Sequence, residues 1–331
     1  MIVALADDLT GALEVGAQFA ARGIRSRVTI STAGEKGFLN VFDMESRHVA
    51  SEDAERIVTG LTPADARLVY LKTDSTLRGN IAASMRALAR LFPDSPIAYV
   101  PAYPELGRTV KNGRLFVDGI PVHQTDFAND PLNPVQDSSI AQLLGPDLPC
   151  VIHDGETSGD VAAAVAAALG DERCRIIAGP ASVAVALASR FGAPSAICWP
   201  RVRSCLIVNG SLHETSARQA AYAETHCPEW RVIRLVIDPG SAPLEIAAQT
   251  ARVVVRGMET DPVDALMIFG GDTAYAILKE LRCAWLEPLG ELVSGVPVSR
   301  IPGRKLHLIT KAGGFGDVSL ICRIQKILHA N

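Results

Sequence analysis

Short apolar runs alternate with helix-like patterns along most of this 331-residue chain. Apolar runs of this length, bounded by polar or glycine-containing turns, predict buried strands rather than helices. They include residues 2–6, 68–71, 97–100, 205–208, 264–269 and 306–309. Strands that alternate with helices in this way predict a parallel sheet covered on both faces. The sequence therefore predicts an α/β fold.

The chain is too long for one ordinary core and predicts two domains. Residues 191–203 contain Gly192, Pro194 and Pro200 and show little periodicity. We place the boundary there, with a first domain at 1–198 and a second domain at 199–331. Each domain is expected to be a mostly parallel sheet flanked by helices.

Composition and charge narrow the class of protein. Hydrophobic residues make up 48% of the chain, charged residues 21%, and the net charge is −4, which gives no electrostatic support for binding nucleic acid or anionic membranes. The seven cysteines are scattered without a CxxC pair, so we expect reduced thiols rather than disulfides or a zinc site. Without a signal-peptide pattern or a membrane-length apolar run, the sequence predicts a soluble, cytoplasmic protein.

Two adjacent carboxylates, Asp7 and Asp8, follow the first predicted strand, and Thr10 and Gly11 precede a helix pattern that begins at Ala12. Open α/β sheets bind ligands at the carboxyl ends of their strands. Adjacent carboxylates repel each other, so the pair is costly unless a cation or several donors surround it. An equally consistent interpretation is an ordinary strand-to-helix turn in which Asp and Thr cap the helix.

Residues 72–80 combine both charge signs and three hydroxyl side chains at the end of the strand 68–71. Asp74 is a candidate general base, and Lys72 would hold a transferring phosphoryl group or orient Asp74. Arg78 carries a planar fork that matches a carboxylate. The alternative is a capped helix start with an ion pair.

Two further arginines are candidates for the same site. Arg47 ends a third predicted strand together with Asp43 and Glu45, and Arg108 lies in a proline-rich insertion between residues 93 and 149. The insertion also contains a hairpin signal, in which two β-rich runs flank residues 118–119. Several carboxylates with three arginines suit a small, hydroxylated anion.

Three strands of the second domain each end in a glycine-containing turn that opens a helix, at residues 209–211, 270–273 and 310–316. Backbone N–H groups at helix starts suit phosphate oxygens, and together the turns would form a phosphate-binding rim. Neither a Walker loop nor a GxGxxG fingerprint is present. Lys311 would neutralise a phosphate, or is a solvated lysine. The seven histidines show no metal-ligand spacing and are expected to be structural or exposed.

Taken together, these motifs resemble the four-carbon acid sugar kinase family. The resemblance runs in order through nearly the whole chain, at residues 6–12, 45–47, 72–79, 101–104 with 107–108, 130–131 with 134–135, 270–274 and 311–316. It departs from the family pattern at Ala312, where a serine is usual, and at residues 212–214.

The resemblance implies a first domain that binds a sugar acid and a second that binds ATP, with an interdomain cleft and Mg²⁺. The reaction implied is phosphorylation of the terminal hydroxyl of a tetronate such as threonate, erythronate or a 3-oxo-tetronate. The resemblance and the residue patterns above together give the expected site. The expected catalytic residues are Asp74, Asp8 and Lys72; the expected sugar-acid contacts are Asp7, Arg47, Arg78 and Arg108; and the expected nucleotide contacts are Ser211, Gly270, Gly271, Asp272, Thr273, Lys311, Gly313 and Gly314.

Two other functions stay open. A non-catalytic family member would bind sugar acid or nucleotide without turnover. A haloacid-dehalogenase-like phosphatase is disfavoured, because aligning Asp8 and Thr10 with the DxDxT motif puts Ala6 where the nucleophile belongs. The metal ligands, the particular tetronate and a possible homo-oligomer are left open.

Overall fold

The computed structural model describes residues 2–30, 35, 37–211, 213–233, 242–311 and 314–329. The chain divides into two compact units, Met1–Val15 with Gly37–Ala193 and Gly16–Lys36 with Pro194–Asn331. The units therefore do not follow from a single cut in the chain, since residues 16–36 group with the second.

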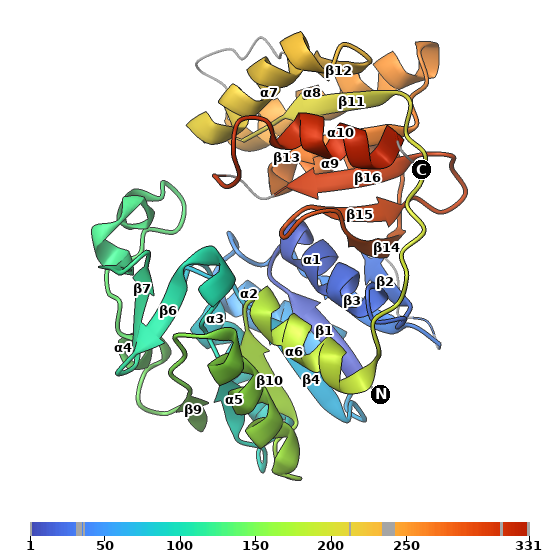
Figure 1. Ribbon diagram of the computed structural model, residues 1–331. Helices are drawn as coiled ribbons and strands as arrows, with labels where there is room; N and C mark the ends of the chain where they lie inside the picture. The colour runs from blue at the N-terminus through green and yellow to red at the C-terminus, as the bar shows by residue number, and fades with distance from the viewer. Residues whose placement is uncertain are drawn as a thin grey trace. The chain divides into compact units, whose positions relative to one another are not determined.

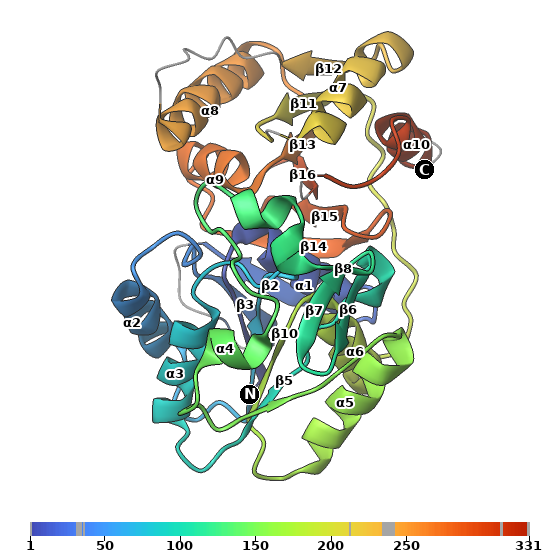
Figure 2. The ribbon, with the colours of Figure 1, turned by 90° about the vertical axis from the view of Figure 1, so that its left-hand side faces the viewer.

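The first unit contains a six-stranded parallel sheet in the order β3-β1-β4-β10-β5-β9. Its strands are β1 (Ile2–Ala6), β3 (Leu39–Asp43), β4 (Leu68–Lys72), β5 (Ile97–Tyr99), β9 (Cys150–Ile152) and β10 (Ile176–Gly179). Helices α2 (Ser51–Leu61) and α3 (Ile81–Leu91) cover one face, and α5 (Ser158–Gly170) and α6 (Ala181–Phe191) cover the other (Figures 1 and 2). The predicted α/β fold is confirmed.

The proline-rich insertion forms a small antiparallel sheet, β6-β7-β8, beside the main one. Its elements are η1 (Pro104–Leu106), β6 (Arg108–Lys111), β7 (Arg114–Val117), β8 (Ile120–Pro121), η2 (Val122–Gln124), η3 (Asp126–Asn129) and α4 (Ile140–Leu144). Asp118 and Gly119 connect β7 to β8 with positive φ angles of 50° and 81°. The predicted hairpin is therefore confirmed.

The second unit has the strand order β12-β11-β13-β16-β15-β14-β2, in which the first four strands are parallel and the last three antiparallel. Its strands are β2 (Ser26–Thr29), β11 (Cys205–Asn209), β12 (Trp230–Ile233), β13 (Ala265–Phe269), β14 (Trp285–Glu291), β15 (Pro297–Arg300) and β16 (His307–Lys311). Its helices are α7 (Glu214–His226), α8 (Pro243–Thr260), α9 (Gly271–Glu280) and α10 (Leu320–His329). Helices α8 and α9 lie on one face of the sheet and α7 and α10 on the other (Figure 2).

Buried apolar side chains line both faces of each sheet. In β1, residues Val3 to Ala6 are fully buried, as is most of β13. A core cluster that includes Trp230, Met267, Phe269 and Ile324 packs beneath α7 and α10. Removing this apolar surface from water is the main stabilisation that fixes the helices on the sheets.

Two local expectations were wrong. The helix α1 (Leu9–Ala20) begins before Ala12, because the Oδ1 atom of Asp8 accepts the N–H of Gly11 and caps the helix there. The sequence also favours a helix over residues 51–60 that is capped by Ser51, but the N-cap residue of α2 is Ala50, and the Ser51 hydroxyl donates to Asn80 instead.

The expectation that all thiols are reduced is also wrong. Cys227, which follows α7, and Cys322, in α10, form a disulfide with their Cα atoms 6.0 Å apart. A sequence separation of 95 residues hides such a pair from any spacing rule.

Candidate active site

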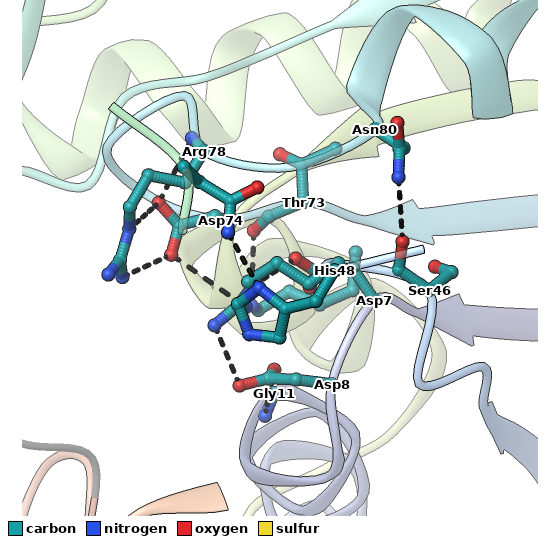
Figure 3. A network of polar contacts seen from close by, with 12 residues as sticks. Asp7, Asp8, Gly11, Ser46, His48, Thr73, Asp74, Arg78 and Asn80 are labelled. Carbon is teal, nitrogen blue, oxygen red and sulfur yellow. Dashed lines mark hydrogen bonds and ion pairs between the residues drawn. The ribbon is translucent and has the colours of Figure 1, made fainter. Parts of the chain in front are cut away.

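The register of the first sheet brings three predicted segments to one edge. Ala6, the last residue of β1, is paired with Asp43 of β3 on one side and with Lys72 of β4 on the other. The residues that follow these strands therefore meet at the carboxyl edge of the sheet (Figure 3). The side chains brought together there include Asp7, Asp8, Arg47, Lys72, Asp74 and Arg78.

Arg47 lies at the centre of three carboxylates. Its Nε donates to Oδ2 of Asp7 at 2.7 Å, its Nη1 lies 3.0 Å from Oδ2 of Asp8, and its Nη2 lies 3.7 Å from Oδ1 of Asp74. Burial raises the pKa of Asp7, whereas for Asp8 the charges of Arg47 and Lys72 outweigh burial and lower the pKa. The negative charges of the adjacent aspartates are therefore balanced mainly by the buried guanidinium of Arg47.

Asp74 is almost fully engaged by donors. Its Oδ1 accepts a hydrogen bond from Nη2 of Arg78 at 2.8 Å. Its Oδ2 accepts hydrogen bonds from the backbone N–H of Thr76 at 2.8 Å and from Nε of Arg78 at 3.2 Å. Burial opposes ionisation, but the charges of Arg78 and Arg47 hold the pKa of Asp74 well below its ordinary value. These contacts fix the side chains of Arg78 and Thr76 around Asp74, and they make Asp74 a weak proton acceptor.

A loop of the insertion reaches the same edge through Asp130. Oδ2 of Asp130 accepts a hydrogen bond from Nη1 of Arg78 at 3.0 Å, and Oδ1 of Asp130 accepts hydrogen bonds from the backbone N–H groups of Leu132 and Asn133. The Asn133 side chain contacts Nδ1 of His48 at 2.6 Å. His48 was predicted to be structural or exposed, and it is exposed.

Lys72 is buried, and its Nζ donates to the carbonyl of Thr73 at 3.0 Å. A Cβ atom at Gly11 would come within 2.7 Å of both this Nζ and Oδ1 of Asp8, so only glycine lets the first turn of α1 approach them. Within the described part of the chain, Lys72 makes no ion pair with Asp74. The prediction that it orients Asp74 through direct contact has no support.

Arg108 differs from the other two arginines. Its guanidinium donates to the carbonyl of Leu106, and it forms no ion pair with the residues that the structure describes. Its Nε is buried and has no hydrogen-bond partner in the described part of the chain. Burial lowers the pKa of Arg108, although the charges of Asp118 and Asp74 act in the opposite direction. Arg47 and Arg78 form ion pairs with aspartates, so Arg108 is the one of these three arginines whose guanidinium has donors available for a ligand.

A small cavity lies behind Asp7, with a volume of about 10 Å³. Three of its lining side chains, Asp7, Ser46 and Thr73, each carry a buried oxygen that has no hydrogen-bond partner among the described residues. A polar cavity of this size is the minimum that accommodates one water molecule.

Two further acidic groups near the edge have raised pKa values, and one of them, Glu14, was not among the predicted site residues. Burial raises the pKa of Glu14 to about 7, against the charge of Lys72. Burial and the neighbouring Glu45 raise the pKa of Asp43 well above its ordinary value. Glu14 lies one turn beyond Gly11 on α1, and only that helical spacing in the sequence would have indicated its place.

In the second unit the three glycine turns converge. The register places Asn209, Phe269 and Lys311 side by side at the ends of β11, β13 and β16. A Cβ atom at Gly210 would overlap the hydroxyl of Thr273, and one at Gly270 would lie 3.3 Å from the backbone of Gly210. The first two turns therefore pack backbone against backbone.

The third turn closes on the first. A Cβ atom at Gly314 would lie 3.3 Å from Nδ1 of His213. The backbone N–H of His213 in turn donates to the Ser211 hydroxyl. Asp272 is exposed at the start of α9. Gly313, like Ala312 and Leu212, lies outside the described residues. The other predicted nucleotide contacts gather at this edge of the second sheet.

Lys311 is fully buried at this edge, with its Nζ over the rings of Phe269 and Phe315 at 5.3 and 4.5 Å. Burial lowers its pKa to about 8. The interpretation of a solvated lysine is therefore wrong.

No group of three or more histidine, cysteine, aspartate or glutamate side chains in the described ranges is arranged to hold a metal ion. None of the helices that the structure describes combines the length and apolar character needed to cross a membrane.

Comparison with known proteins finds two family models that match different parts of the chain. Residues 2–149 match a family model described as a sugar-binding N-terminal domain, and residues 240–321 match one described as a nucleotide-binding C-terminal domain. The D-threonate kinase of Bordetella bronchiseptica is 29% identical over 98% of this chain and 96% of that protein. The 3-oxo-tetronate kinase of Methylobacterium radiotolerans is 25% identical over 96% of this chain and 97% of that protein.

The chain belongs to the four-carbon acid sugar kinase family. As a member of that family it is a phosphotransferase, and its second unit contains the family's nucleotide-binding domain. A Salmonella typhimurium structure described as a putative tRNA synthase has a TM-score of 0.79 and 18% identity, covering 98% of this chain and 99% of that one, and shows the same fold.

A second structural relative comes from Bordetella bronchiseptica. It has a TM-score of 0.52 and 25% identity, covers 99% of this chain and 98% of its own, and is described as a domain-swapped dimer with bound citrate.

Proposed function

We propose that this family member is an ATP-dependent kinase that phosphorylates the terminal hydroxyl of a four-carbon sugar acid. The observation that carries the proposal is the aspartate–arginine network at the carboxyl edge of the first sheet, with Arg108 beside it. Relatives named D-threonate kinase, D-erythronate kinase and 3-oxo-tetronate kinase support the substrate class.

Arg108 is our choice for the carboxylate of the sugar acid. A carboxylate prefers a guanidinium fork that has free donors, and the forks of Arg47 and Arg78 are occupied by aspartates. The citrate bound to the Bordetella bronchiseptica relative is itself a hydroxylated carboxylate, which supports an anion of this kind.

Asp8 is the better candidate for the base that accepts the hydroxyl proton. Its side chain is 20% exposed, whereas that of Asp74 is 7% exposed and saturated with donors. Lys72 would help to neutralise the charge that develops on the transferring group. Phosphoryl transfer demands positioning and charge neutralisation more than a strong base, so a carboxylate with a lowered pKa is adequate.

The three glycine turns would hold the triphosphate, with Lys311 as the nearby cation. Helix starts at Glu214 and Gly271 direct backbone N–H groups toward this edge. Mg²⁺ in kinases is held by one or two carboxylates together with phosphate oxygens, so the exposed Asp272 fits a magnesium ligand without a larger protein cage. When bound, Mg²⁺ would offset phosphate charge. The reaction also requires the two substrates to meet, so the interdomain cleft stays a prediction.

The test is ADP release, measured by a coupled assay, from purified protein with ATP and a panel of tetronates and 3-oxo-tetronates. We expect turnover with at least one of them, a loss of about 10²–10⁴-fold in kcat for Asp8→Asn, and a raised KM for the sugar acid in Arg108→Met. Asp137→Asn, on the exposed surface, is the matched control. ATP binding without turnover on any acid would indicate a non-catalytic member, and full activity of Asp8→Asn would remove that residue from the role of base.

A homo-oligomer remains an expectation, supported by the domain-swapped dimer of the relative. Sedimentation velocity at several protein concentrations would measure it. A single monomeric species throughout would contradict it.

A further inference from the structure

One buried amide contacts the third glycine turn of the second unit. Gln219 lies in the middle of α7 and is 0% exposed. Its Nε2 lies 3.1 Å from the carbonyl oxygens of Phe315 and Gly316 and 2.9 Å from that of Asp317. Its two N–H bonds are therefore shared among three successive carbonyl groups of one turn.

The turn fits closely around this amide. Gly316 has a φ of 86°, and a Cβ atom there would lie 2.7 Å from Leu320 and 3.2 Å from Nε2 of Gln219. A larger residue would be strained by its backbone conformation and would also push the amide away. Gln219 and Gly316 thus depend on each other for their positions.

The three hydrogen bonds set the direction of the backbone dipoles in the turn. In a planar trans peptide the N–H points opposite to the carbonyl of the same unit. Carbonyl groups drawn toward Gln219 therefore turn the N–H groups of the following residues away from α7. Without the amide, the carbonyl groups of Phe315 and Gly316 would lose this donor, and that of Asp317 would keep the N–H of Leu320 at 3.2 Å, so at least two hydrogen bonds of the turn would be lost.

Gln219 also connects two of the converging turns. Its helix follows the first turn, which contains Ser211, and its amide contacts the third turn between β16 and α10. His213, at the start of the same helix, packs against Gly314. One helix therefore holds the first and third turns in a fixed spacing.

We infer that Gln219 is a positioning residue for nucleotide binding, which holds residues 315–317, at the described end of the third glycine turn, in the conformation that accepts ATP phosphates. This inference rests on the proposed function of the turns. Gln219 touches no substrate; it acts through the backbone of residues 315–317.

The experiment compares Gln219→Met with Gln325→Met in the full-length protein. Gln325, in α10, is the matched control, because it is also a buried glutamine of the second unit but donates to Glu229 rather than to the turn. We expect Gln219→Met to raise the Kd and KM for ATP at least tenfold, with kcat at saturating ATP and the KM for the sugar acid nearly unchanged. Gln325→Met should keep the wild-type affinity for ATP.

Amide hydrogen exchange gives a second readout that does not need ATP. Peptides covering residues 314–320 should exchange at least tenfold faster in Gln219→Met, while those covering β11 and β13 keep their wild-type rates. Faster exchange throughout the second unit would instead indicate a general loss of stability and would overturn the positioning role.

Gln219→Glu adds a signature that a packing role would lack. A carboxylate cannot donate to the three carbonyl groups, whereas a protonated carboxyl can donate once. ATP affinity of this variant should therefore improve, relative to the wild type, as the pH falls. Wild-type ATP affinity in Gln219→Met would overturn this inference alone, whereas a wild-type protein that binds no nucleotide would overturn the proposed function and this inference with it.

Discussion

Replacing Arg47 by methionine removes the cation that lies among Asp7, Asp8 and Asp74. Two contacts, at 2.7 and 3.0 Å, are hydrogen-bonding distances, and the third is 3.7 Å. Hydrogen bonds to charged groups contribute about 1.5–3 kcal/mol each, and breaking a buried ion pair by removing one partner costs about 3–5 kcal/mol. With side-chain exposures of 7–20% at these positions, we expect the free energy of unfolding to fall by about 3–5 kcal/mol at pH 7.

The pH dependence of the free energy of unfolding should change sign in this variant as well. In the wild type, Asp8 and Asp74 have lowered pKa values, so their contribution is present above the ordinary pKa and is lost as the pH falls through the native value. Without Arg47, Asp7 and Asp8 lose the largest charge that opposes burial, so burial would raise their pKa values, whereas Arg78 still lowers that of Asp74. The native variant would then bind more protons than its unfolded chain, and its stability would increase as the pH falls toward 4.

Urea denaturation followed by far-ultraviolet circular dichroism at several pH values measures both effects. All three tryptophans lie in the second unit, so their fluorescence would miss this change, and hydrogen exchange of β1 and β4 peptides should localise it. Arg56→Met is the matched control: Arg56 is 80% exposed and pairs with Asp53 on α2, so we expect less than about 0.5 kcal/mol. Equal losses in the two variants, or an unchanged pH slope, would refute the central role of Arg47.

Three further predictions concern other buried groups. The pKa of Glu14 is raised to about 7, so the native protein should lose stability as the pH rises from about 4.5 to 7, and Glu14→Gln should abolish this loss and gain about 3 kcal/mol at pH 8 in urea titrations. Because the pKa of Lys311 is lowered to about 8, ATP affinity measured by calorimetry should fall as the pH rises through 8, and Lys311→Met should bind about tenfold more weakly at pH 7 without that dependence. Cys322→Ser should lower the stability of the second unit by about 2–4 kcal/mol in tryptophan-monitored unfolding, and reduction of the wild type should have the same effect.

The sequence predicted the strands and the place of the site because both depend on local patterns. Buried runs such as residues 2–6 and 68–71 became strands, and parallel pairing then brought Asp7, Asp8 and Asp74 to one edge. The same logic placed the three glycine turns together. Strand ends of one parallel sheet meet whatever the detailed packing, so this inference needs no knowledge of distant contacts.

Features that depend on distant contacts could not be predicted. The pairing of Arg47 with three aspartates, the approach of Asp130 to Arg78, and the amide of Gln219 beneath a turn almost 100 residues away each require the folded chain. Nor does any local pattern show that β2 pairs with β14, because that pair joins residues far apart in the sequence.

The pairing of β2 with β14 has a consequence for how the protein is made. The strand Ser26–Thr29 is synthesised long before its partner Trp285–Glu291, because most of the described chain lies between them. The sheet of the second unit can therefore be completed only after residues 285–291 have been synthesised, and until then the edge of β2 that pairs with β14 has no partner strand. An isolated carboxyl-terminal half, expressed from residue 194 onward, would lack its terminal strand, so a workable separate module must carry residues 16–36 as a graft.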